Sequence, residues 1–190
     1  IRVFLQGSTD EAIAEELIKA IENPNQVNRH DKTLLSHLDI DGTFHVVLIT
    51  TDHLDEMDIV ERKRLSYRLQ IYLEFISHNG IFFYYDGNFV LVTNSIPTGD
   101  LRMIIDNFIN KKNLYMPNRN VNIGVSSKVE DITNLHVAYD RAKAAVSMAK
   151  QRKETIIYFN EMGIYRMLYS IKDTALLDEM GEDLLMPLIE

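Results

Sequence analysis

The sequence predicts an α+β fold in which an antiparallel sheet of the split βαβ type carries helices on one face. Three observations predict it. Apolar runs over residues 44–159 follow the order β-α-β-β-α-β-α-β, and the first six match the split βαβ arrangement. The pair Asp86-Gly87 separates two β-rich runs, which is typical of a two-residue hairpin turn. The runs assigned to helices carry apolar residues at spacings of three and four.

Each element of this order has its own signal. Strands are expected over residues 44–50, 81–85, 88–93, 121–126 and 155–159. Two long helices are expected over 58–78 and from residue 99 onward. A third helix carries a stripe of mostly small residues, namely Leu135, Ala138, Ala142, Ala145 and Ala149. Such a stripe would let this helix lie close to the sheet.

Helical segments are expected on both sides of this core. Ser8, Thr9 and Asp10 precede Glu11 in a capping-box pattern, which predicts a helix to about residue 21. A loop follows, and then a short helix over 32–38. Two further helices are expected over 161–170 and 174–187, so we divide the chain into a helical lead-in (1–40), a central domain (41–160) and a helical tail (161–190).

Composition and charge restrict the class of protein. Hydrophobic residues make up 46% and charged residues 25%, as in a soluble globular protein, and no apolar run approaches the length of a membrane span. Cysteine is absent, which excludes disulfides and thiolate chemistry and fits a cytoplasmic location. The net charge of −8 repels phosphate backbones, so we expect no tight binding of nucleic acid by this chain alone.

The predicted hairpin is apolar on both faces. One face carries Ile81, Phe83, Tyr85, Val90 and Val92, and the other carries Phe82, Tyr84, Phe89 and Leu91. A sheet with helices on one side should have a polar second face, so something must cover the second apolar face. The flanking helices or a partner subunit or effector could do so. We expect Tyr84 and Phe89 opposite the two long helices, and the four-residue set as a possible interaction face.

No metal, cofactor or catalytic site is expected. The acids Asp52, Asp55, Glu56 and Asp58 follow the first strand, where a cation could sit, although a solvated loop that caps the next helix is the favoured interpretation. The six histidines show no pair at i, i+4 on one helix. Neither a phosphate-binding glycine loop nor a dinucleotide fingerprint occurs.

Three segments resemble the GGDEF domain of diguanylate cyclases. Residues 47–54 are similar to the family's apolar strand and its Asp-x-Asp-His-Phe exit, and the hairpin at 84–89 stands where Tyr-Gly-Gly-Asp/Glu-Glu-Phe would be. Residues 123–126 and the alanine stripe are similar to the family's Ser-Ile-Gly-Val strand and the helix after it. The resemblance implies the GGDEF-like version of the split βαβ fold.

The departures from that pattern bear on activity. The resemblance aligns Thr50 with the family's metal-binding Asp, Gly87 with its second metal-binding acid, and Asn88 with the acid after it. Tyr85 and Asp86 replace the glycines that let the backbone approach the nucleotide. Because the cyclase needs two carboxylates to hold divalent cations, we expect a degenerate signature hairpin, Tyr85, Asp86, Gly87, Asn88 and Phe89, without enzyme activity.

The chain resembles one group of degenerate GGDEF-like domains in particular, that of the bacterial PucR/CdaR transcriptional regulators. Residues 158–168 are similar to the group's Tyr-x-(Asp/Glu)-x-Gly-hydrophobic-Tyr-x-Leu-Leu segment, and 184–189 to a helix ending in Leu-x-Pro-Leu. Residues 4–7 and 38–40 are similar to the group's lead-in, although the loop between them fits it poorly.

In this group a helix-turn-helix segment follows the Leu-x-Pro-Leu helix, so we expect this chain to be a piece of a longer protein. The resemblance implies a non-catalytic regulatory domain that forms a homodimer, responds to an effector or an upstream sensor, and reaches DNA only through that C-terminal segment. Two alternatives remain. One is a stand-alone protein–protein interaction module, and the other is an active nucleotidyl cyclase, which would need an acid at Thr50 or Gly87.

Overall fold

The computed structural model describes residues 8–24, 43–54, 56–76, 80–94 and 98–170. The predicted helices over 32–38 and 174–187 lie outside these residues. The helices are α1 (Ser8–Glu22), α3 (Ile59–Ile76), α4 (Thr98–Tyr115), α5 (Leu135–Arg152) and α6 (Ile164–Ser170), with 3-10 turns η2 (Ile132–Asn134) and η3 (Phe159–Glu161). The strands are β1 (Phe44–Thr51), β2 (Gly80–Tyr85), β3 (Asn88–Asn94), β4 (Val121–Val125) and β5 (Ile156–Tyr158).

These strands form one mixed sheet in the order β2-β3-β1-β4-β5. β3 pairs antiparallel with both β1 and β2, and β1 pairs antiparallel with β4. This is the split βαβ arrangement that the sequence predicts, because β3 lies between two mutually parallel strands. β5 extends the sheet by pairing parallel with β4, and it is shorter than predicted because Phe159 begins η3.

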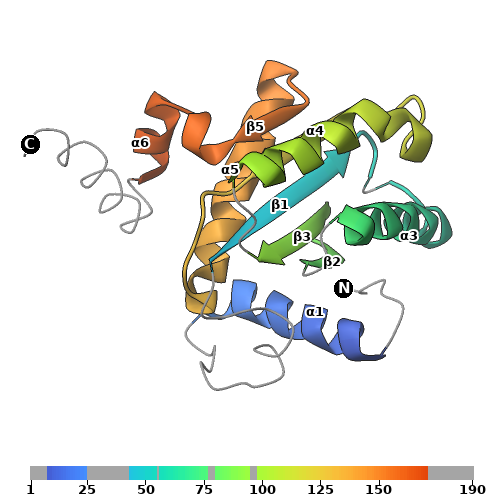
Figure 1. Cartoon of the computed structure of the whole chain (residues 1–190), viewed down its shortest axis with the longest axis horizontal. Helices are drawn as coiled ribbons and strands as arrows, with labels where there is room; N and C mark the ends of the chain where they lie inside the picture. The colour runs from blue at the N-terminus through green and yellow to red at the C-terminus, as the bar shows by residue number, and fades with distance from the viewer. Residues whose placement is uncertain (1–7, 25–42, 55, 77–79, 95–97, 171–190) are drawn as a thin grey trace, which may run out of the picture.

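Helices cover both faces of this sheet, and Figure 1 shows α1 and α4 on opposite sides of β1. Val47 and Ile49 of β1 pack with the apolar side chains of α3 and α4, whereas Val46 and Leu48 pack with those of α1 and α5. The α+β fold class is therefore confirmed, but the expectation of helices on one face holds only for α3 and α4. Every residue of β1 is buried, which explains why its central residues, 46–49, are all apolar and do not alternate with polar ones.

The small-residue stripe of α5 lets this helix approach β4 closely, as predicted. Gly124 of β4 lies against the turn of α5 that carries Ala142 and Val146. A Cβ atom at Gly124 would collide with main-chain atoms of both residues, which cannot move without displacing the helix. Only glycine at this position allows the observed packing.

The β2–β3 hairpin turns at Asp86 and Gly87, as predicted. Their φ angles are 46° and 74°, and two positive values are what a type I′ turn requires. Ile81, Phe83, Tyr85, Val90 and Val92 all belong to the face covered by α1 and α5.

The placement expected for the possible interaction face is wrong. Its members, Phe82, Tyr84, Phe89 and Leu91, lie on the face that α3 and α4 cover, not opposite these helices. Phe89 is 0% and Phe82 2% exposed, so the chain's own helices bury the centre of this set. A flanking N-terminal helix, α1, does cover one face of the sheet as expected, but it covers the face that carries Phe83, Val90 and Val92. None of the described helices is long and apolar enough to cross a bilayer.

Candidate functional site

The fold brings together the two places where the sequence departs from the cyclase pattern. Ile49 of β1 and Phe89 of β3 are the last pair of the β1–β3 ladder, and Thr50 and Asn88 come next at the same end of the two strands. We call the end of β1 and the adjacent hairpin turn, residues 50–51 and 85–88, the signature corner.

Neutral groups stand at the aligned positions of the signature corner. Thr50 is 2% and Asn88 8% exposed, and Gly87 has no side chain. The Asn88 side-chain amide donates to the main-chain oxygen of Asp86 at 2.7 Å, so it braces the turn. The buried Thr51 hydroxyl has no hydrogen-bond partner within the described part of the chain. Hydroxyl and amide oxygens do not supply the negative charge that holds Mg²⁺ against a triphosphate.

Asp86, the one carboxylate of the signature corner, points towards α5. Lys143 donates to its Oδ2 atom at 2.6 Å, and the Tyr139 hydroxyl lies 3.4 Å from the same oxygen. Tyr139 packs edge-on against Tyr85 with ring centroids 5.5 Å apart, and the Tyr85 hydroxyl donates to Glu22 of α1 at 3.2 Å. The hairpin turn is therefore tied to both α1 and α5.

Both tyrosines of this network stay protonated well above neutral pH. Burial, followed by the nearby Glu22 carboxylate, raises the pKa of Tyr85 to about 12. Burial and the Asp86 carboxylate also raise the pKa of Tyr139. Each phenol therefore acts as a hydrogen-bond donor to a carboxylate and not as a general base.

The acids after β1 are occupied in local interactions where the structure describes them. Asp58 Oδ1 accepts a hydrogen bond from the Glu61 main-chain nitrogen at 2.7 Å, which caps α3 and confirms the capping interpretation for this residue. Asp52 accepts from the Asn120 amide at 2.6 Å, and Glu56 pairs with His53 at 3.0 Å. Asp55 lies outside the described residues. Within the described ranges, no three His, Asp or Glu side chains are grouped as metal ligands would be.

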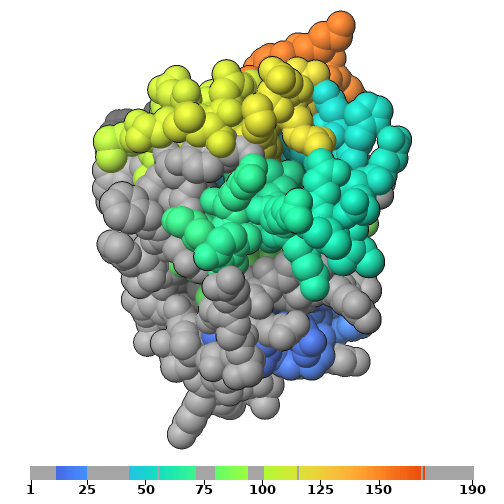
Figure 2. Space-filling model, turned by 90° about the vertical axis from the view of Figure 1, so that its right-hand side faces the viewer, coloured from blue at the N-terminus to red at the C-terminus, as the bar shows by residue number. Residues whose placement is uncertain are grey.

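A pocket of about 310 Å³ lies between α3 and the loop that leads from α4 to β4. Figure 2 shows the face on which α3 and the C-terminal part of α4 lie side by side. The pocket lining comprises Glu61, Arg64, Leu65, Arg68, Met116, Pro117 and Arg119. The pocket could not be predicted from the sequence, because more than 50 residues separate Arg119 from the α3 arginines. The one local signal is the run of basic residues between 62 and 68.

Comparison with known proteins agrees with this fold. Residues 30–148 match the GGDEF-like domain family, which is more than half of the chain, so the chain belongs to that family. No curated protein matches the chain in sequence.

Two solved structures are similar to it. The GGDEF domain of DgcB from Caulobacter crescentus in complex with c-di-GMP aligns with a TM-score of 0.54 and 11% identity, over 83% of this chain and 99% of that one. A microbial GGDEF domain studied for its interaction with cyclic di-GMP aligns with a TM-score of 0.49 and 14% identity, over 81% and 94% of the two chains. At 11% sequence identity, the similarity to the DgcB domain shows a shared fold and nothing more.

Proposed function

We propose that this GGDEF-like domain is the non-catalytic, dimerising regulatory domain of a cytoplasmic bacterial transcriptional regulator of the PucR/CdaR type. Its role is to receive a signal from an effector or an upstream sensor and to pass it to a DNA-binding segment after Glu190. The observation that carries the non-catalytic part of this proposal is the chemistry of the signature corner.

At that corner Thr50 and Gly87 replace the two carboxylates that a cyclase of this fold uses to hold cations. The remaining acid, Asp86, is neutralised by Lys143 at 2.6 Å and is directed at α5. Tyr85 also occupies the position of a glycine that would let a nucleotide approach. These features support a corner that serves structure and not phosphoryl transfer.

The same contacts support a transmitting role. Asp86 and Tyr85 connect the hairpin turn to α5 and α1, and α5 leads through β5 into α6 at the C-terminal side. A shift of the turn would therefore change its contacts with α5, the helix that precedes β5 and α6. A two-state change of this kind is what a signal-transmitting domain requires.

Exposed apolar side chains on α3 support self-association. Val60, Tyr67 and Ile71 follow one another at spacings of seven and four residues, so they lie along one stripe of the helix, and each is 44–57% exposed. A stripe of this kind is more common at an interface between subunits than on a monomer's surface.

The proposal is tested by comparing this chain with the natural protein extended past Glu190. We expect the extended protein to shift duplex DNA in a sequence-dependent way, and this chain to give no shift at micromolar concentration. Light scattering of both proteins should give the mass of a dimer. An extended protein that does not bind DNA would favour the stand-alone interaction module. A sequence-dependent shift by this chain alone would show that the DNA-binding element lies within residues 1–190 and not after them.

A further inference from the structure

The pocket between α3 and the 116–119 loop is positively charged on an acidic protein. Three arginines and one glutamate line it, whereas the whole chain carries a net charge of −8. None of the lining residues belongs to the signature corner. The pocket is therefore a separate feature of the surface, and the charge of its lining is opposite in sign to the net charge of the chain.

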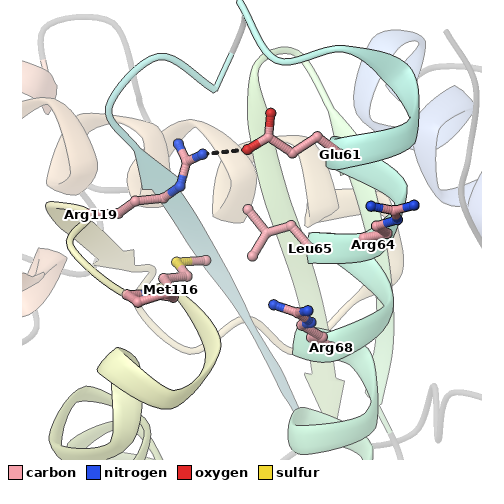
Figure 3. A pocket seen from close by; sticks show the side chains of 7 residues that line it. Glu61, Arg64, Leu65, Arg68, Met116 and Arg119 are labelled. Atoms are coloured by element: carbon pink, nitrogen blue, oxygen red, sulfur yellow. Dashed lines mark hydrogen bonds and ion pairs between the residues drawn. The ribbon is translucent and has the colours of Figure 1, made fainter.

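The single acid of the pocket neutralises only one of its arginines. Arg119 donates to Glu61 Oε1 at 2.6 Å, and this ion pair spans one end of the pocket (Figure 3). A second Arg119 nitrogen lies 3.4 Å from the main-chain oxygen of Asp52, which fixes the guanidinium further. No ion pair engages Arg64 or Arg68 within the part of the chain that the structure describes. Two positive charges therefore remain for an anion.

Apolar side chains lie between these charged groups. Leu65 and Met116 face one another in the pocket and are 7% and 1% exposed, and the Arg68 side chain reaches in from α3 beside them (Figure 3). A volume of about 310 Å³ is at the lower end of the range that holds small-molecule ligands. Apolar walls with a few charged groups are the usual composition of such sites.

We propose that this pocket binds a small organic anion. Its phosphate or carboxylate group pairs with the guanidinium groups of Arg64 and Arg68, with Arg119 at the far end, because guanidinium forms paired hydrogen bonds with both kinds of oxyanion. Its apolar body covers Leu65 and Met116. Binding requires neither catalysis nor DNA binding, and only a regulatory consequence of binding rests on the proposed function.

Phenyl phosphate is a suitable probe because it combines an oxyanion with a small apolar ring. In a titration of the isotope-labelled protein at low ionic strength, we expect saturable shifts of the backbone amide resonances of residues 61–68, 116, 118 and 119. The dissociation constant should be on the order of 1 mM for a ligand of this size. Inorganic phosphate and phenol each carry half of the recognised chemistry, so each should bind at least about tenfold more weakly.

Two arginine variants separate this site from general attraction to exposed cations. Arg68→Gln should weaken phenyl phosphate binding about tenfold or more. The matched change Arg152→Gln, at an exposed arginine of α5 outside the pocket, should leave the dissociation constant within about twofold. Equal effects of the two changes, inorganic phosphate that binds as tightly as phenyl phosphate, or shifts spread over all exposed arginines would overturn the proposal. Because binding is read directly, none of these outcomes bears on cyclase activity or DNA binding.

Discussion

Replacing Phe89 with alanine tests whether the signature hairpin belongs to the core. The Phe89 ring is fully buried beneath α3 and α4, and its centroid lies 5.7 Å from that of Phe82 and 5.6 Å from that of Tyr84. Truncation of a large buried aromatic costs about 3–5 kcal/mol, which already includes roughly 0.5–1.5 kcal/mol for each ring pair that is lost. The variant should therefore lose a large part of a typical stability of about 5–15 kcal/mol while keeping its oligomeric state.

Urea unfolding followed by circular dichroism gives the free energy of unfolding, and light scattering gives the mass. Tyr165→Ala is the matched control, since it also removes an aromatic ring, but one that is 46% exposed on α6, outside the α3 stripe. The control should change the free energy of unfolding by no more than about 0.5 kcal/mol. A loss below about 1 kcal/mol for Phe89→Ala, or a change from dimer to monomer with unchanged stability, would refute the burial of Phe89 by the chain's own helices.

Three further predictions concern α5 and the turn. Gly124→Ala should lower the free energy of unfolding by about 1–3 kcal/mol because the new methyl group collides with the main chain of α5, whereas Ser147→Ala on the exposed side of α5 should be nearly neutral. The side chains of the Asp86–Lys143 pair are half exposed, so a double-mutant cycle with Asp86→Asn and Lys143→Met should give a coupling energy below about 1 kcal/mol. A coupling energy above about 2 kcal/mol would contradict this, because it would mean that the ion pair holds the turn more tightly than an exposed pair can. Tyr85 should ionise near pH 12 and not near pH 10 in an absorbance titration, with the Tyr85→Phe variant as the reference. Because folding raises the pKa of this phenol, the free energy of unfolding should fall as the pH rises from 10 to about 12. Ionisation of Tyr85 near pH 10 would contradict the buried, acid-paired environment described for it.

The element order was predictable because its signals are local. Alternation and helical spacing gave the strands and helices, Asp86-Gly87 gave the turn, and the stripe of small residues on α5 predicted the close contact that Gly124 makes possible. The resemblance to GGDEF domains aligned Thr50 and Gly87 with the family's two metal-binding acids, and the strand order and register bring the end of β1 next to the hairpin turn.

The faces of the sheet were not predictable in the same way. Alternation in the hairpin correctly divided its residues into two sets, but it carries no information on which helix covers which set. The apolar run of β1 over residues 46–49 does indicate burial on both sides of the sheet, which conflicts with the one-sided arrangement expected from the split βαβ pattern. The contact of Asp86 with Lys143 joins residues 57 positions apart, so it depends on the packing of α5 and not on any local pattern.

The most direct test of the central claim is an assay for nucleotide cyclisation. Purified protein is incubated with GTP or with ATP in the presence of Mg²⁺ or Mn²⁺, and the products are separated by chromatography beside a heat-denatured blank. The absence of cation-holding carboxylates at Thr50 and Gly87 predicts no cyclic or cyclic dinucleotide product above the blank. Turnover clearly above the blank would contradict the proposal that this GGDEF-like domain is non-catalytic.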